Sequence, residues 1–168
     1  METKTPTDIL KMAILLEKRG KSFYSQVAEQ TKDEEVRQVF QFMAAEEQMH
    51  VEFLARQFSF YEKNKSFDTN EAMISAGDES VINTILTEGM KSKISASGFE
   101  AAAISAAMDF ETRAIDAYAS YAATATDPNE KEMFTWLADW ERGHHKVLHQ
   151  MDEELKERIW NDNQFWPF

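Results

Sequence analysis

Two motifs of the form Glu-x-x-His occur in the sequence, and each begins thirty residues after an isolated glutamate. On a helix, a step of three residues places both side chains on one face, so that they can bind a common metal ion. One such motif arises often by chance, whereas a second copy with the same spacing is a specific signal. Six residues are therefore predicted to form a dinuclear metal site: Glu17, Glu47, His50, Glu111, Glu141 and His144.

The two halves of the sequence are alike beyond these motifs. A shift of 94 positions aligns residues 13–54 with residues 107–148 without a gap, and eleven of the aligned pairs are identical. The identical pairs include Tyr24 with Tyr118 and Phe40 with Phe134. This repeat predicts two helical hairpins related by duplication, with a pseudo-twofold axis that carries one half of the site onto the other.

Four amphipathic helices are predicted to position these residues, each with an apolar seam interrupted by the candidate ligands. They are expected at about residues 7–30 and 33–63, from near Ser97, and from Asp127 onward. A Thr5-Pro6 start precedes the first helix, a capping-box pattern at Ser97 precedes the third, and Asp127 caps the fourth. Because both hairpin turns are short, the helices of each hairpin are expected to be antiparallel neighbours.

The chain is predicted to be an all-α four-helix bundle, with residues 1–168 forming a single domain. Residues 66–96 are expected to form the long crossover between the hairpins, with one short helix inside it. The aromatic C-terminal tail, residues 158–168, is expected to dock on the bundle or on a second subunit, because it would otherwise expose an apolar patch. A homodimer is the expected assembly.

The candidate glutamates differ from ordinary solvated ones because they lie on the apolar seams. Four buried carboxylates without counter-charge would each cost on the order of several kcal/mol, whereas two divalent cations would cancel their charge. Carboxylate oxygen and imidazole nitrogen suit iron, manganese or zinc. The repeat then predicts Glu17 and Glu111 as terminal ligands, Glu47 and Glu141 as bridging ligands, and one histidine for each metal.

Other polar residues lie close to the motifs. Tyr24 and Tyr118 are either ordinary buried tyrosines or donors of a hydrogen bond to a ligating carboxylate. His145 is expected to be a neighbouring histidine rather than a further ligand. Glu46 is rotated by about 100° from Glu47 on the helix and is expected to face outward.

The composition excludes several classes of protein. The sequence contains no cysteine, which rules out a disulfide framework, a thiolate zinc site, an iron–sulfur cluster and a rubredoxin-type centre. The net charge of −12 argues against nucleic acid as a partner. No apolar run reaches the roughly eighteen residues of a membrane span. The N-terminal residues lack the pattern of a signal peptide, so the cytoplasm is the expected location.

The sequence resembles the ferritin-like superfamily, and most closely its rubrerythrin branch. Four stretches carry the resemblance: Leu16–Arg19, Ala44–His50, Phe110–Arg113 and Glu141–His144. It implies a ferritin-like bundle whose six site residues hold two iron ions, with manganese or zinc as alternatives, and which reduces hydrogen peroxide. Rubrerythrins usually receive electrons through a rubredoxin centre. Because this sequence has no such module, the resemblance implies a separate electron-donor protein.

The sequence departs from typical rubrerythrins at two positions. Additional site glutamates are expected one turn after Glu111 and Glu141, where Ala114 and His144 stand. The remaining pattern of six ligands is similar to that of bacterioferritin. The leading hypothesis is an oxidoreductase that reduces peroxide or oxygen, and the alternative is a protein that handles iron by oxidising Fe²⁺. A third reading is a metal-binding scaffold without catalysis.

Overall fold

The computed structural model describes residues 5–32, 34–68 and 98–162. Four helices make up this part of the chain: α1 (Pro6–Gln30), α2 (Glu34–Asn64), α5 (Phe99–Thr124) and α6 (Pro128–Asp162). The prediction of an all-α four-helix bundle is confirmed. The expected crossover helix and the predicted start of the second helix at Asp33 lie outside the described residues.

The helices begin where local chemistry favours a start. Thr5 and Asp8 form a capping box on α1, because the side chain of each accepts a hydrogen bond from the backbone N–H of the other. The Asp127 carboxylate accepts from the backbone N–H of Asn129 at 2.8 Å, which caps α6. The predicted cap of α5 is wrong, because that helix begins one residue later with Gly98 as its cap and no capping side chain.

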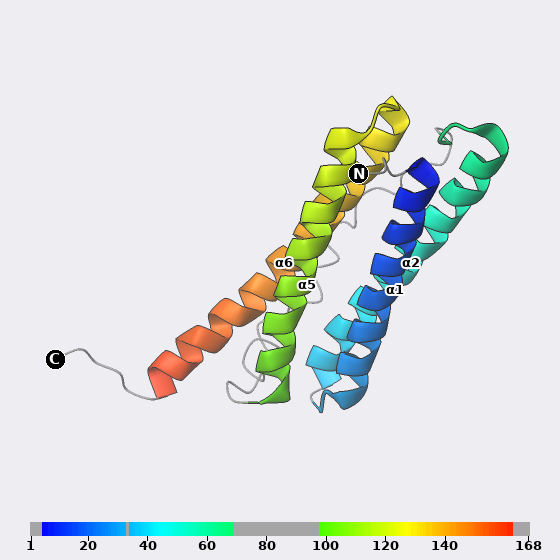
Figure 1. Ribbon diagram of the computed structural model, residues 1–168. Coiled ribbons are helices and arrows are strands. Elements are labelled where there is room, and N and C mark those ends of the chain that lie inside the picture. Colours follow the sequence, from blue (N-terminus) through cyan, green and yellow to red (C-terminus); the bar gives the residue numbers. More distant parts are fainter. Residues whose placement is uncertain (1–4, 33, 69–97, 163–168) are drawn as a thin grey trace.

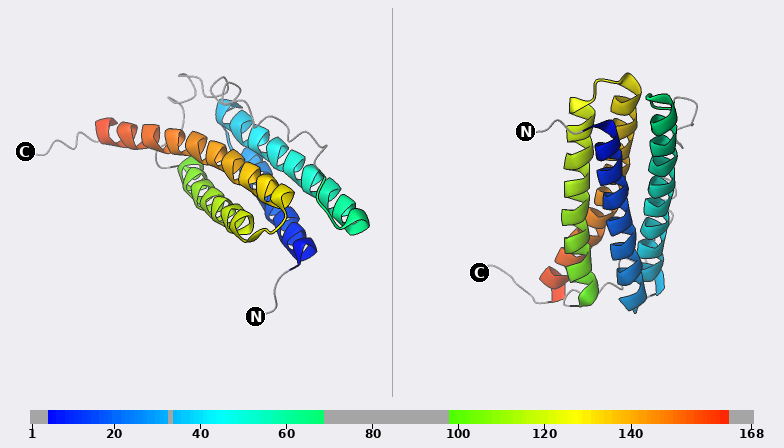
Figure 2. Two further views of the ribbon diagram at one scale, coloured as in Figure 1. Left: turned by 90° about the horizontal axis from the view of Figure 1, so that it is seen from above. Right: turned by 45° about the vertical axis from the view of Figure 1, so that its right-hand side comes forward.

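The four helices are arranged as two hairpins (Figure 1). Helix α1 packs along α2, and α5 packs along α6. The two hairpins lie side by side in both views of Figure 2. Helices α1 and α5 approach each other across them, and side chains of α2 contact side chains of α6. None of the helices in the described part of the chain combines the length and the apolar character needed to cross a membrane.

The apolar seams form two core clusters, one on each side of the candidate site. The first cluster includes Tyr24, Phe40 and Leu148, and the second includes Leu54 and Tyr118. Along each helix the candidate ligands lie between residues of the first cluster and residues of the second. The bundle therefore encloses a polar layer between two apolar ones.

The C-terminal end of the bundle differs from the prediction. Helix α6 continues through Asp162, so the first five residues of the predicted aromatic tail are helical. Trp160 lies on this extension with 60% of its surface exposed. The final turns of α6, drawn in red, diverge from α5 in Figure 1. The remaining aromatic residues of the predicted tail, Phe165, Trp166 and Phe168, lie outside the described residues.

Candidate metal centre

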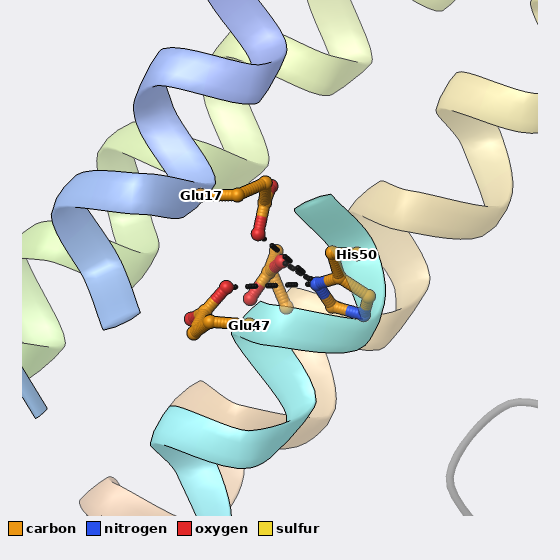
Figure 3. A group of neighbouring side chains, drawn as sticks. Glu17, Glu47 and His50 are labelled. Carbon is orange, nitrogen blue, oxygen red and sulfur yellow. Dashed lines mark hydrogen bonds and ion pairs between the residues drawn. The ribbon is translucent and has the colours of Figure 1, made fainter. Parts of the chain in front are cut away.

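The six residues singled out by the motifs come together between the helices. Helix α1 contributes one, α2 two, α5 one and α6 two, and none is more than 1% exposed. In Figure 3, the side chains of Glu17 from α1 and of Glu47 and His50 from α2 point toward one another. Two groups of four residues can be distinguished within the cluster.

The first group surrounds Nδ1 of His50. This nitrogen lies 3.1 Å from Oε2 of Glu17, 3.3 Å from Oε1 of Glu141 and 3.6 Å from Oε2 of Glu47. One ligand atom from each of the four residues lies within 4.8 Å of the others. This compactness is what a single metal ion requires of its ligands.

The second group surrounds Nδ1 of His144. This nitrogen lies 3.0 Å from Oε2 of Glu141, 3.5 Å from Oε1 of Glu111 and 3.8 Å from Oε1 of Glu47. Glu47 and Glu141 thus belong to both groups, and each directs one carboxylate oxygen toward one histidine and its other oxygen toward the other. A carboxylate whose two oxygens face different histidines can serve as a ligand to two metal ions.

Several atoms of the cluster are buried without a hydrogen-bond partner in the described part of the chain. They include Oε1 of Glu47, Oε2 of Glu111, both carboxylate oxygens of Glu141, and Nδ1 of His144. Buried polar atoms without partners are costly, and metal coordination would satisfy them. The residues therefore fit a pair of divalent ions that accept oxygen and nitrogen ligands, such as iron, manganese or zinc.

Burial and mutual repulsion raise the pKa values of two carboxyl groups. Burial, followed by the nearby carboxylates of Glu141 and Glu17, raises the pKa of Glu47 well above its ordinary value. Burial and the Glu141 carboxylate raise the pKa of Glu111 to about 8. Burial alone would also raise the pKa of Glu141, but the two histidines hold it well below its ordinary value.

The pKa values of the two histidines are shifted upward, in the opposite direction to the shift that burial alone would cause. Burial alone would lower the pKa values of His50 and His144. The facing carboxylates, led by Glu17 for His50 and by Glu141 for His144, raise both pKa values well above the ordinary one. The metal-free cluster therefore retains protons near neutral pH, and a metal ion must displace them.

Two buried tyrosines connect the hairpins at the cluster. The hydroxyl of Tyr24 on α1 donates to Oε1 of Glu111 on α5. The hydroxyl of Tyr118 on α5 donates to Oε1 of Glu17 on α1. Each tyrosine therefore orients the isolated glutamate of the opposite hairpin, and the two bonds are related by the internal repeat.

Glu46 corrects the prediction that it faces outward. Its side chain is 3% exposed, and its Oε2 accepts hydrogen bonds from Nε2 of His144 at 2.7 Å and from Nε1 of Trp140 at 3.4 Å. The prediction failed because α6 covers this side of α2. The sequence repeat held a usable signal, since the residue aligned with Glu46 is Trp140, a large residue of a type that is usually well buried.

His145 lies beside the cluster without joining it. It is half-buried, and its ring stacks on that of His149 with 6.4 Å between ring centroids. Neither four-residue group at the bundle centre includes it.

Gly20 allows the carboxylate of Glu47, which both groups share, to approach α1. A Cβ atom at Gly20 would lie 3.1 Å from Cδ and from Oε1 of Glu47, and 2.9 Å from Cε1 of Phe110. The distance to Phe110 is shorter than real Cβ contacts, and the distances to Glu47 are tight enough that its carboxylate would have to shift by a few tenths of an ångström. A side chain one turn after Glu17 would therefore displace both neighbours.

The fold and the buried cluster define a ferritin-like bundle with a carboxylate–histidine centre suited to metal binding. The family model described as Rubrerythrin matches residues 8–152, so the chain belongs to the rubrerythrin family. A solved structure with a similar fold is a hypothetical protein from Pyrococcus furiosus, with a TM-score of 0.64 and 22% sequence identity over 91% of both chains. No curated protein matches the sequence.

Proposed function

We propose that this protein is a non-haem di-iron oxidoreductase that reduces hydrogen peroxide or oxygen with electrons from a separate donor protein. The observation that carries the proposal is the sharing of Glu47 and Glu141 between the two four-residue groups. Glu47 and Glu141 would then be ligands shared by two iron ions. Glu17 and His50 would complete one set of ligands, and Glu111 and His144 would complete the other.

When bound, a pair of iron ions would supply two one-electron redox centres, which match the two electrons that, with two protons, reduce one peroxide to two water molecules. The protein would position the ligands of both ions and keep bulk water away from them. The two apolar clusters on either side of the centre exclude bulk water, which strengthens the electrostatic interactions inside it. The shared carboxylates provide negative charge that balances the charge of the metal ions.

The tyrosines hold the terminal carboxylates in place. Burial, followed by the Glu111 and Glu47 carboxylates, raises the pKa of Tyr24 well above its ordinary value, so its hydroxyl stays protonated near neutral pH. It can therefore remain a hydrogen-bond donor to Glu111. Outer hydrogen bonds of this kind orient metal ligands and tune their basicity.

Electrons would reach the centre from a separate protein. The sequence contains no cysteine and so cannot form the thiolate iron centre through which rubrerythrins usually receive electrons.

Oxidation of Fe²⁺ for iron handling is a second candidate function. The observation that favours it is the residue one turn after Glu111. Ala114 is 2% exposed and lies on the buried face of α5, where typical rubrerythrins carry an additional site glutamate. The resulting set of six ligands is similar to that of bacterioferritin.

Anaerobic loading with Fe²⁺, followed by stopped-flow mixing with peroxide and with oxygen, separates these functions. Repeated turnover of peroxide or oxygen in the presence of a reductant supports the oxidoreductase. Oxidation followed by stoichiometric release of Fe³⁺ supports iron handling instead. An iron-loaded protein that reacts with neither oxidant contradicts both and indicates a non-catalytic scaffold. The matched control is Glu132→Ala, which removes an exposed glutamate from α6 and should behave as wild type.

A further inference from the structure

Glu46 and Trp140 break the symmetry of the centre. The internal repeat aligns these two residues with each other, so they occupy equivalent positions in α2 and α6. They also touch, since Nε1 of Trp140 donates to Oε2 of Glu46 at 3.4 Å. Equivalent positions beside the two histidines therefore hold a carboxylate in one half and an indole in the other.

The ring of His144 has carboxylates beside both of its nitrogens. Its Nδ1 faces the carboxylates of the second group, and its Nε2 lies 2.7 Å from Oε2 of Glu46. With a metal at Nδ1, the proton of the ring resides on Nε2 and is donated to Glu46. Such a bond fixes the tautomer and orientation of the ring and makes it a stronger ligand.

His50 has no corresponding acceptor. Its Nε2 is buried and has no hydrogen-bond partner among the described residues. The ring instead meets Trp140 nearly edge-to-face, with centroids 5.1 Å apart and an interplanar angle of 87°, and it meets Trp136 at 5.9 Å. An indole ring orients the imidazole by packing but cannot accept the Nε2 proton as a carboxylate does.

We propose that Glu46 and Trp140 make the two metal positions unequal, so that the position beside His144 fills first and the position beside His50 binds its metal more weakly and exchanges it. The inference rests on the dinuclear centre proposed above. Glu46 favours the position beside His144 in two ways. It accepts the Nε2 proton of His144, which makes that ring a stronger ligand, and its buried carboxylate adds negative charge near the metal.

Metal titration of the full-length, metal-free protein tests the proposal without measuring turnover. Titration with Zn²⁺ by calorimetry should give two binding steps whose affinities differ by about 10–100-fold, the usual effect of an outer carboxylate on a ligating histidine. In crystals grown with one equivalent of Zn²⁺, anomalous scattering should place the ion beside His144. Equal occupancy of the two positions, or preferential filling beside His50, overturns the proposal.

Three variants identify the residue responsible. Glu46→Gln removes the charge at nearly constant volume and should weaken the tighter step by about 10–100-fold, so that the two steps converge. Glu62→Gln removes an exposed charge from the same helix and should leave both steps unchanged. Trp140→Phe keeps a ring against His50 but removes the indole N–H, and should retain two separate steps.

The outcomes distinguish failure of this inference from failure of the dinuclear centre. Two ions bound with equal affinity contradict the inference and leave the centre intact, whereas a protein that binds no metal contradicts both. If Glu46→Gln weakens both steps equally, Glu46 acts on the fold as a whole, and the proposal is wrong. If Trp140→Phe alone merges the steps, the carboxylate is not the cause, and the proposal is again wrong.

Discussion

The hydroxyl of Tyr24 in the first hairpin donates a hydrogen bond to the carboxylate of Glu111 in the second. Both residues are fully buried, and they lie 87 positions apart in the chain. The bond therefore connects the two halves of the molecule at the level of the candidate metal centre. It belongs to a symmetric pair with the bond from Tyr118 to Glu17.

Replacing Tyr24 by Phe should destabilise the metal-free protein by about 1–3 kcal/mol, because Oε1 of Glu111 loses its buried donor. The same change should weaken metal binding by about 10–100-fold, since the carboxylate is no longer oriented. Chemical denaturation and metal titration measure the two effects. Tyr121→Phe is the control, because that half-buried ring packs on Phe134 and should tolerate the change. Wild-type behaviour of Tyr24→Phe in both assays would show that the bond is unimportant.

Glu47→Ala and Glu141→Ala should each lower metal occupancy at both positions, because each carboxylate faces both histidines. Elemental analysis of the loaded proteins should show fewer than two ions per chain. Glu132→Ala serves again as the exposed control. Full metal content in both the Glu47 and the Glu141 variant would contradict the dinuclear assignment.

The metal-free protein should lose stability as the pH rises from about 5.5 to about 8.5. The folded-state pKa of Glu111 is raised to about 8, so folding favours its protonated form. The resulting contribution to the free energy of unfolding is fully present below the ordinary glutamate pKa. It is lost as the pH rises through the raised pKa of Glu111. Raised pKa values of Glu47, His50 and His144 act in the same direction.

Thermal melting across this range checks the sign of the effect. We expect the Tm of metal-free protein to fall by more than about 4 °C, since 1 kcal/mol shifts a domain of this size by about 2–4 °C. Metal-loaded protein should show the smaller change, because metal binding strengthens as its ligands deprotonate. A metal-free protein whose Tm rises with pH would indicate that the acids are solvated.

Gly20→Ala should weaken metal binding even though alanine favours the helix by about 0.5–1 kcal/mol. The added methyl group meets Phe110 and Glu47, so the phenyl ring and the shared carboxylate are both displaced. Metal titration and a crystal structure of the variant would detect the displacement. Lys18→Ala, an exposed change on the same helix, provides the control. Unchanged affinity would mean that the centre accommodates the methyl group without cost.

Truncation after Asn161 tests the expected homodimer. The deletion removes three aromatic residues of the kind that dominate protein interfaces, namely Phe165, Trp166 and Phe168. If they bridge subunits, light scattering at low micromolar concentration should show a shift toward monomer. An unchanged mass with a lower Tm would assign the tail to its own subunit. No change in either would contradict a structural role for the tail.

The sequence by itself determined the four helices and the face of each that carries the candidate ligands. A helix is regular, so spacing alone places Glu47 and His50 on one side and predicts the seam around them. The repeat supplied the correspondence between the two halves. The predicted four-helix bundle agrees with the observed helices. The resemblance to rubrerythrins agrees with the match to the Rubrerythrin family model.

Only the tertiary structure decided which residues meet across helices. Tyr24 contacts the glutamate of the other hairpin rather than its own, and Glu46 is buried against His144 although its helical position suggested solvent. Such contacts depend on how the helices are aligned and rotated against one another. That arrangement results from packing of the whole core, to which residues far apart in the sequence contribute together, so local spacing does not determine it.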